Sequence, residues 1–220
     1  MKKTQYVLMA LTMTLGLAVQ AQEAKAGDAV AGQKKAAMCI GCHGIPGYRA
    51  SFPEVYQVPM ISGQGDKYIV SALTAYRKGD RKHPTMRSIA GSLTDGDIAD
   101  LAAYYAAGGT QGSTSAAAGE PGADVAALLT KGNCVACHGA NLSKPIDPTY
   151  PKLAGQHPDY LLAALKAYKT EGNANVGRAN AIMGAQAKPY SNAELKLLAK
   201  YISTLPSDLQ VVSNSKIKAH

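Results

Sequence analysis

Two short stretches of the sequence each bring two thiols and one imidazole together. Residues 39–43 read CIGCH and residues 134–138 read CVACH, and between them they contain all four cysteines of the 220-residue chain. Two thiols three residues apart could bind zinc, form a small disulfide or exchange disulfides. The Cys-x-x-Cys-His pattern, however, is the attachment signature of covalently bound haem. Thioether bonds from both thiols to the haem vinyl groups would bring the adjacent imidazole beneath the iron.

The haem interpretation gives a role to every reactive residue of the two stretches. A zinc site made of the four cysteines, or two small disulfides, would leave both histidines without a role. A thioredoxin-like redox motif would need a βαβ context, which the sequence lacks. We therefore expect two covalently bound haem c groups, with the imidazoles as proximal iron ligands. The predicted attachment residues are Cys39, Cys42, Cys134 and Cys137, and the predicted proximal ligands are His43 and His138.

The amino-acid composition also favours a large apolar cofactor. The chain contains no Trp, one Phe and twelve Tyr, although 46% of its residues are hydrophobic. Domains smaller than about 70–80 residues often need a metal or disulfides to support their core. A porphyrin in each half would supply the apolar volume that large side chains do not.

The N-terminal residues predict export. Two lysines precede a charge-free, mostly apolar segment over residues 6–19, and small residues then provide cleavage sites after Ala21 or Ala26. This is the pattern of a secretory signal peptide. The apolar segment is shorter than the ~20 residues of a membrane-spanning helix, although an uncleaved anchor is the alternative. We expect residues 1–26 to be removed and the mature protein to lie in the periplasm, with at most peripheral association with the inner membrane.

The remaining sequence is an internal duplication with a period of about 95 residues. PMISGQGDKYIVSALTAYRKG, which begins at Pro59, matches PKLAGQHPDYLLAALKAYKTEG, which begins at Pro151. LTDGDIADLAAYY, from Leu93, matches YSNAELKLLAKYI, from Tyr190. Each copy is long enough to hold its own core, so the repeat predicts two similar domains.

The predicted domains are separated by a segment of different composition. We place the first domain at residues 27–110 and the second at residues 122–206. Residues 111–121 are rich in Gly, Ser, Thr and Ala, which is typical of a flexible linker. Residues 207–220 are expected to form a short basic tail.

Each half has the pattern of an all-α domain. A short helix, over about residues 28–38 or 124–130, is expected to lead into the cysteine motif, with Asp28 or Asp124 as its N-cap. A second helix follows a Gly-Gln pair and repeats the same apolar face in both halves. No segment alternates convincingly as a strand. The last helix of each half should open with a capping box, formed by Thr94 with Asp97 and by Ser191 with Glu194.

The distal iron ligands are predicted from the repeat. Met183, in RANAIMGAQAK, is the only methionine of the second half, and it aligns with Met86 in RKHPTMRSIAG. Met60 aligns with Lys152 instead, and Met38 adjoins a cysteine and could not easily reach the opposite haem face. A methionine sulfur opposite histidine raises the reduction potential and fills the sixth position on the iron. We therefore assign Met86 and Met183 as the distal ligands.

The other histidines and the loop prolines complete the predicted sites. His83 and His157 could form bis-histidine sites, but neither has a histidine at the matching position of the other half. A histidine that binds a metal usually donates its second ring N–H to a carbonyl or a carboxylate. Pro59 and Pro151 follow the proximal histidines at the same point of the repeat, so their carbonyls are the candidate acceptors.

These motifs together resemble those of the dihaem class I c-type cytochromes, most closely the cytochrome c4 family. The resemblance rests on CxxCHG twice, on the SGQ…Y and AGQ…Y blocks, and on the methionine loops before each last helix. It implies two tandem cytochrome c domains with His/Met-ligated haem, and electron delivery in the periplasm toward a respiratory terminal oxidase. One departure is IPGYRASFPEVYQVPM, residues 45–60, which is three residues longer than its counterpart.

The residues themselves also favour an electron carrier. The sequence shows no nucleophile with a base, no carboxylate dyad and no phosphate loop, and iron with both axial positions filled cannot bind a substrate. Three alternatives are a dihaem subunit of a periplasmic oxidoreductase, such as flavocytochrome sulfide dehydrogenase, a peroxidase or thiosulfate-oxidising cytochrome, and a zinc-binding structural protein. The second alternative would need an open or exchanged distal position at one haem.

A basic segment predicts how a partner would dock. The chain has a formal net charge of +8, and residues 77–87 carry five basic side chains against one acidic one. We expect a redox partner with an acidic docking surface and no nucleic acid. The basic residues are Arg77, Lys78, Arg81, Lys82 and Arg87.

Overall fold

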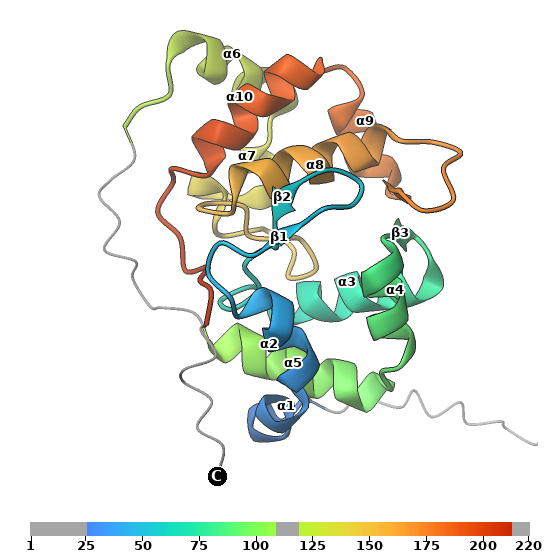
Figure 1. Ribbon diagram of the computed structural model, residues 1–220. Helices are drawn as coiled ribbons and strands as arrows, with labels where there is room; N and C mark the ends of the chain where they lie inside the picture. Colours follow the sequence, from blue (N-terminus) through green and yellow to red (C-terminus); the bar gives the residue numbers. More distant parts are fainter. Residues whose placement is uncertain (1–25, 109–118, 213–220) are drawn as a thin grey trace, which may run out of the picture.

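The computed structural model describes residues 26–108 and 119–212. The predictions for the signal peptide, for most of the linker and for the end of the basic tail fall outside these residues. Within them, the chain folds into two mainly helical domains that lie against each other (Figure 1). The all-α prediction is confirmed, with four strands of two residues each as the only additions in the described ranges.

The first domain holds the cysteine motif near its start and a long helix at its end (Figure 1). Its elements are, in chain order, α1 (Ala29–Lys35), α2 (Ala37–His43), β1 (Arg49–Ala50), β2 (Tyr56–Gln57), α3 (Asp66–Lys78), β3 (Arg81–Lys82), α4 (Pro84–Gly91) and α5 (Asp95–Ala107).

The second domain repeats this order without the first strand pair. Its elements are α6 (Ala123–Gly132), α7 (Val135–His138), the 3-10 turn η1 (Ala140–Leu142), α8 (Pro158–Lys169), β4 (Gly177–Arg178), α9 (Ala181–Ala187) and α10 (Asn192–Ile202).

The helix starts confirm three of the four predicted caps. The Asp28 carboxylate accepts hydrogen bonds from the first N–H groups of α1, the closest at 2.7 Å. Both capping boxes are present at the starts of α5 and α10. The prediction for Asp124 is wrong, because α6 begins at Ala123 with Gly122 as its N-cap. Asp124 therefore lies in the first helical turn, where a carboxylate is favoured by the helix dipole instead.

The core of the first domain depends on a close crossing of α1 and α5. A Cβ on Gly32 would lie 2.0 Å from the carbonyl oxygen of Asp100, so only glycine lets the two helices approach this closely. The buried cluster around the crossing consists of Ala36, Ile40, Ile69, Leu101, Ala102 and Tyr105.

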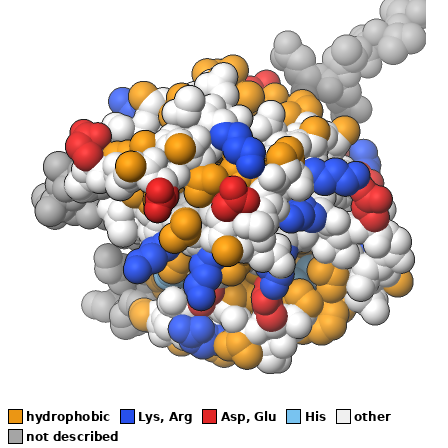
Figure 2. All heavy atoms as spheres, turned by 90° about the horizontal axis from the view of Figure 1, so that it is seen from above, with side chains coloured by type: hydrophobic (Ala, Val, Ile, Leu, Met, Phe, Trp, Pro, Cys, Tyr) orange, Lys and Arg blue, Asp and Glu red, His pale blue; other side chains and the backbone are white. Residues whose placement is uncertain are grey.

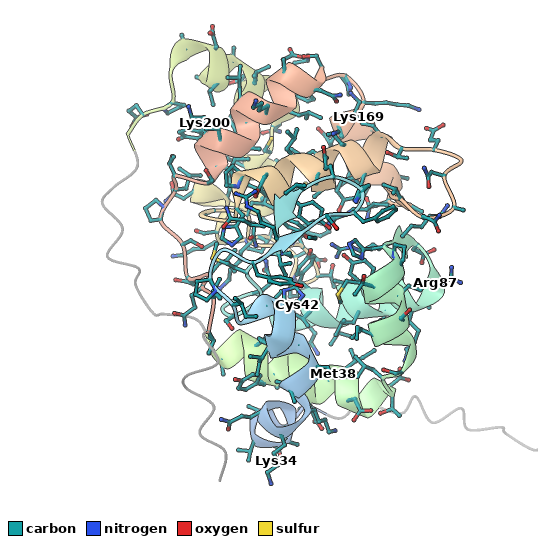
Figure 3. The ribbon with its side chains drawn as sticks, viewed as in Figure 1. Lys34, Met38, Cys42, Arg87, Lys169 and Lys200 are labelled. Carbon is teal, nitrogen blue, oxygen red and sulfur yellow. The ribbon has the colours of Figure 1, made fainter. Side chains whose placement is uncertain are left out.

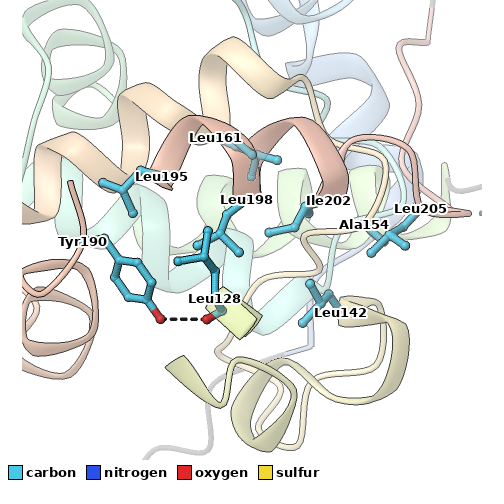
Figure 4. Close-up of a cluster of buried hydrophobic side chains, with 10 residues drawn as sticks. Leu128, Leu142, Ala154, Leu161, Tyr190, Leu195, Leu198, Ile202 and Leu205 are labelled. Atoms are coloured by element: carbon cyan, nitrogen blue, oxygen red, sulfur yellow. Dashed lines mark hydrogen bonds between the residues drawn. The ribbon is translucent and has the colours of Figure 1, made fainter. Parts of the chain in front are cut away.

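The core of the second domain is built from larger side chains (Figure 4). Its buried cluster is mainly aliphatic and gathers under α8 and α10. The Tyr190 hydroxyl closes it by donating a 2.9 Å hydrogen bond to the Leu128 carbonyl of α6. The other members of the cluster are Leu142, Ala154, Leu161, Leu195, Leu198, Ala199, Ile202 and Leu205.

The two domains pack together through equivalent elements. Strands β3 and β4 pair antiparallel, with Arg81 opposite Arg178. These two arginines occupy the same position of the repeat, so the domains meet about an approximate twofold axis that passes between them. The domains are thus joined by direct contact as well as by the linker.

The longer loop of the first domain forms an arm, residues 49–57, that reaches the second domain. Strands β1 and β2 pair as a hairpin whose second strand lies against α8 (Figure 1). The Asp159 carboxylate of α8 accepts hydrogen bonds from the Gln57 backbone N–H at 2.9 Å and from Arg49 at 3.1 Å. Lys166 of α8 donates to Glu54 at 2.7 Å. The longer loop of the first domain therefore builds an interdomain contact.

The described part of the predicted tail crosses back to the first domain. Leu205 and Leu209 are buried, and the Gln210 N–H donates to the Ser62 carbonyl at 3.0 Å. Residues 207–212 are therefore a packed strap rather than a free basic tail, and residues 213–220 fall outside the described residues. Within the described residues, no helix has both the length and the apolar character needed to cross a bilayer.

Candidate haem sites and the interdomain centre

The first cysteine motif lies on a single helical turn beside a loop carbonyl. Cys39, Cys42 and His43 all belong to α2, and neither thiol is in a disulfide. The His43 Nδ1 atom lies 2.8 Å from the Pro59 carbonyl oxygen, which is the acceptor predicted from the repeat. Cys42 lies at the centre of the molecule in Figure 3, on the side of α2 that faces the second domain.

The second motif repeats this arrangement. Cys134 immediately precedes α7, which holds Cys137 and His138, and both thiols are free. The His138 Nδ1 atom lies 3.0 Å from the Pro151 carbonyl oxygen. Gly139 then turns the chain with φ of +74°, and a Cβ there would lie 1.7 Å from the Lys144 carbonyl oxygen. The backbone therefore requires a glycine directly after His138.

The carbonyl contacts fix the tautomer of both histidines. A carbonyl only accepts, so Nδ1 carries the proton and donates it, which leaves the Nε2 lone pair free to bind a metal. Burial lowers the pKa of both His43 and His138, although each carbonyl contact opposes that change. Both imidazoles are therefore neutral near pH 7, in the form that binds iron.

The two methionines predicted as distal ligands occupy equivalent positions. Met86 lies in the first turn of α4 and Met183 in the first turn of α9, and both are half-buried. In each helix a side chain at the N-cap accepts a hydrogen bond from the methionine N–H. His83 Nδ1 does so at 3.4 Å and Asn180 Oδ1 at 2.9 Å. The assignment of both methionines as ligands stays a prediction.

The competing candidates have other roles. His83 is an N-cap, and its Nε2 atom lies 3.0 Å from the Tyr56 hydroxyl. Met38 is 54% exposed on α2 (Figure 3). The four cysteines do not gather, since no group of three or more His, Cys, Asp or Glu side chains in residues 26–108 and 119–212 could hold a metal ion. This arrangement excludes a single zinc site made from the four cysteines.

The donor chemistry in each domain fits haem c. Two free thiols lie one helical turn apart, and an imidazole with a free Nε2 follows them directly. Cys39 and Cys134 also pack against the buried clusters of their domains. Each domain therefore has the thiols for two thioether bonds and the nitrogen for a proximal iron bond on one short segment.

Sequence reasoning missed a cationic centre between the domains. Arg81 and Arg178 are both enclosed by repeat-related tyrosines at the domain contact. Arg81 donates to Tyr68 at 3.2 Å and to Tyr160 at 3.4 Å, and Arg178 donates to Tyr160 at 3.1 Å. The sequence does show that the two arginines are equivalent, because each stands five residues before its methionine in the aligned halves.

The two arginines have no carboxylate partner in the described part of the chain. Each guanidinium lies over a tyrosine ring, with Arg81 4.6 Å from the Tyr76 ring and Arg178 5.3 Å from the Tyr168 ring. The Arg81 Nε atom is buried and lacks a hydrogen-bond partner among the described residues. Burial opposes ionisation of Tyr160, but Arg178 and Arg81 outweigh it and lower the pKa of Tyr160 to about 8. The centre is therefore strongly positive and favours anions.

A small cavity adjoins this centre. Its volume is about 40 Å³, and its lining includes both arginines, Tyr160 and His83. A cavity of this size is large enough for one water molecule. The interdomain contact therefore contains charged and polar side chains at its middle, unlike the aliphatic core of the second domain.

These positions correct the docking surface expected from the sequence. Arg81 is only 9% exposed at the domain contact, and Lys82 donates to the Asn173 carbonyl of the other domain at 2.7 Å. Arg77 pairs with Asp95 at 2.6 Å. Of the five basic residues, Lys78 and Arg87 remain exposed. On the face shown in Figure 2, basic side chains are interspersed with acidic and hydrophobic ones rather than gathered in one patch.

Comparisons with known proteins agree with the duplicated fold and site. The family model for cytochrome c matches residues 29–106 and again residues 122–206. Cytochrome c4 of Azotobacter vinelandii is 32% identical over 215 residues, which cover 90% of this chain and 98% of the relative. The crystal structure of reduced cytochrome c4 from Pseudomonas stutzeri is 31% identical, with a TM-score of 0.60, and the match covers 82% of this chain and all of that one. The thiosulfate dehydrogenase electron acceptor of Stutzerimonas stutzeri is 29% identical over 202 residues, 88% of this chain and 91% of the relative.

Two tandem cytochrome c domains, each with a Cys-x-x-Cys-His motif, define a dihaem c-type cytochrome. The chain belongs to the cytochrome c4 family. It accordingly binds two covalently attached haem c groups, one in each domain, and acts as an electron carrier.

Proposed function

We propose that the protein is a periplasmic carrier that moves single electrons between respiratory partners, with a terminal oxidase as acceptor. In each domain, two cysteines attach the haem, a histidine is the proximal ligand and a methionine is the distal ligand. These residues are Cys39, Cys42, His43 and Met86 in the first domain, and Cys134, Cys137, His138 and Met183 in the second.

The observation that carries this proposal is the duplicated geometry around the two imidazoles. Each Nδ1–H is held by a proline carbonyl, so each Nε2 is presented in one fixed direction. Each predicted distal methionine lies in the first turn of its helix, and its backbone N–H donates to the N-cap side chain. When both axial positions are taken by side chains, substrates cannot reach the metal, and this supports a carrier rather than an enzyme.

The haem supplies one-electron redox chemistry when it is bound, and the chain sets the electrostatics around it. Arg81 and Arg178 are the candidates to receive the haem carboxylates, because they are a buried and a half-buried cation without a carboxylate partner among the described residues. Arginine suits this role through its planar, multiply donating group. Both arginines lie where the domains meet, so we expect them to act on both haem groups.

The periplasmic location and the domain limits are part of the proposal. They rest on the leader pattern of residues 1–26 and on the composition of residues 111–121. Domain limits at 27–110 and 122–206 agree with the packing of α1 on α5 and of α6 on α10, which closes each domain at its two ends.

A second candidate is supported by one group of relatives. The relative from S. stutzeri named as a thiosulfate dehydrogenase electron acceptor spans most of this chain. The protein would then receive electrons from a thiosulfate-oxidising enzyme. The two candidates are compatible, because the thiosulfate-oxidising enzyme would donate electrons and the terminal oxidase would accept them. Each partner would need its own docking contact.

The proposal is tested by a redox titration of the purified protein followed by optical spectra. We expect two haems per chain that remain with the denatured polypeptide in acidified organic solvent, and a ferric spectrum with the iron-to-sulfur band of His/Met ligation. Haem that is extracted by the solvent would contradict covalent attachment. The reduced protein is then mixed with a terminal oxidase, and the oxidised protein with a thiosulfate dehydrogenase and thiosulfate. Rapid electron transfer in the first mixture supports the oxidase as partner, and transfer only in the second supports the alternative.

A further inference from the structure

Two buried glutamines connect the domains in a crossed pattern. Gln64 and Gln156 occupy the same position of the repeat, directly after a glycine, and each is 4% exposed. Each side chain points into the opposite domain rather than into its own. Gln64 bonds to both backbone groups of Lys152, and Gln156 bonds to both backbone groups of Met60.

The four hydrogen bonds are short and reciprocal. Gln156 Oε1 accepts from the Met60 N–H at 3.0 Å, and its Nε2 donates to the Met60 carbonyl at 2.9 Å. Gln64 Oε1 accepts from the Lys152 N–H at 2.8 Å, and its Nε2 donates to the Lys152 carbonyl at 3.0 Å. Each glutamine amide thus pairs with the N–H and the carbonyl of one residue of the other domain, as the backbone of a neighbouring β-strand would.

Met60 and Lys152, the residues bonded by the glutamines, directly follow the prolines whose carbonyls accept from the proximal histidines. The Pro59 carbonyl and the Met60 N–H belong to one peptide group, and the Pro151 carbonyl and the Lys152 N–H to another. His43 donates to the oxygen of the first group at 2.8 Å, while Gln156 accepts from its N–H at 3.0 Å. Hydrogen bonds that share a polarisable group strengthen one another. A glutamine of one domain therefore increases the negative charge on the carbonyl that holds the histidine of the other.

We propose that Gln64 and Gln156 are positioning residues for the proximal histidine of the opposite domain. Gln156 acts through the Pro59–Met60 peptide on His43, and Gln64 acts through the Pro151–Lys152 peptide on His138. The inference rests on the proposed function, because it takes both histidines as iron ligands. A stronger acceptor at Nδ1–H makes an imidazole more basic, and a more basic ligand favours ferric iron. Each domain thereby tunes the reduction potential of the haem in its neighbour.

The test uses the full-length holoprotein and the variants Gln64→Met and Gln156→Met, which change the volume little. They remove the four interdomain bonds and also the bonds that the same Oε1 atoms accept from the Gly65 and His157 N–H groups. Two quantities are measured: the potential of each haem, and the exchange rate of each proximal Nδ1–H by NMR of the ferrous protein. Gln156→Met should accelerate exchange at His43 about tenfold and raise the potential of the first haem, with about a threefold shift in its one-electron equilibrium (~28 mV). Gln64→Met should do the same to His138 and the second haem. Gln156→Glu keeps an acceptor for the Met60 N–H and should leave exchange at His43 close to the parent value.

Specific outcomes would overturn the inference. Effects in the same domain as the substitution, equal effects on both haems, or no effect would each contradict a crossed role. The proposed function fails in a different way, because imidazole Nδ1–H signals without haem-induced shifts in the parent protein would show that His43 and His138 are not ligands. If either methionine variant fails to fold, Gln64→Asn and Gln156→Asn provide the crossed comparison, because their shorter amides stop one methylene short of the opposite backbone and should give the same crossed changes.

Discussion

The two domains hold their proximal histidines alike but support their methionine helices differently. In the second domain the N-cap of α9 is Asn180, whose side chain bonds to the Met183 N–H. In the first domain the N-cap of α4 is His83, whose ring also contacts the Tyr56 hydroxyl and packs edge-on against Phe52 of the arm. The arm in turn lies on α8 of the second domain. The residues proposed to bind the haem are thus the same in both domains. The residues that cap the methionine helices differ, because in the first domain the cap also contacts the arm.

The interdomain arginines should have the largest effect on the reduction potentials of the two haems, and they test whether both domains share this influence. Replacing Arg178 or Arg81 with Gln removes a positive charge from the centre between the domains. Positive charge near a haem favours the reduced iron, so both reduction potentials should fall. We expect a fall of about 59 mV, which is a tenfold shift in the one-electron equilibrium. Redox titration of each variant measures this. Arg87→Gln, at an exposed position, is the control, and a fall at one haem alone would show that each arginine serves only its own domain.

A smaller effect, confined to one domain, is expected from the histidine cap. His83→Ala removes the side chain that accepts from the Met86 N–H and leaves the first turn of α4 less fixed. Loss of an N-cap costs about 1 kcal/mol, which corresponds to about a fivefold change in an equilibrium. The ferrous methionine methyl signal of the first haem should broaden or shift in NMR spectra, with that of the second unchanged. His83→Asn should restore the parent signal, because Asn180 makes the same cap. Equal changes in His83→Ala and His83→Asn would show that the Tyr56 contact matters more than the cap.

The smallest effect concerns the first helices. The Asp100 carboxylate accepts from the Asp28 N–H at 2.8 Å and from Lys35 at 2.6 Å, and these contacts lower its pKa. A lowered carboxyl pKa in the folded protein gives stability that is present at neutral pH and is lost as the pH falls below the ordinary range of Asp. The first domain should therefore become easier to unfold by urea below about pH 4, and Asp100→Asn should reduce this pH dependence. An unchanged dependence in the variant would assign the acid sensitivity to other carboxylates.

Much of this architecture could be predicted because it repeats in the sequence. The capping boxes of α5 and α10, and the contacts of His43 with Pro59 and of His138 with Pro151, follow from residue types at matched positions. Contacts between the two halves could not be predicted in this way, because a repeat shows what the copies share and not where they touch. For that reason the sequence alone predicts Arg81 as part of a docking surface, whereas the structure encloses it at the domain contact. Local charge counts cannot show that a basic residue is enclosed by tyrosines from another domain.

The cap at Asp124 shows a second limit. Asp28 lies eleven residues before Cys39, whereas Asp124 lies only ten before Cys134, and α6 begins before its aspartate while α1 begins after it. A one-residue offset is enough to move an aspartate from the N-cap into the first helical turn. The three-residue insertion in the first domain was visible in the alignment, but its use as an arm depended on Asp159 and Lys166, which lie about one hundred residues away.

The central claim is that both domains use the same pair of axial ligands, and Met183→Ala tests it most directly. Met183 is the only methionine after Met86 in the sequence, so the second haem has no other thioether in its own domain. Methionine favours ferrous iron and gives the ferric iron-to-sulfur band. The account predicts that the band falls to about half its parent intensity and that one haem potential falls, while the other haem keeps its Met86 signal. A Met183→Ala spectrum identical to the parent would contradict the distal assignment in both domains, because Met86 was assigned by alignment to Met183.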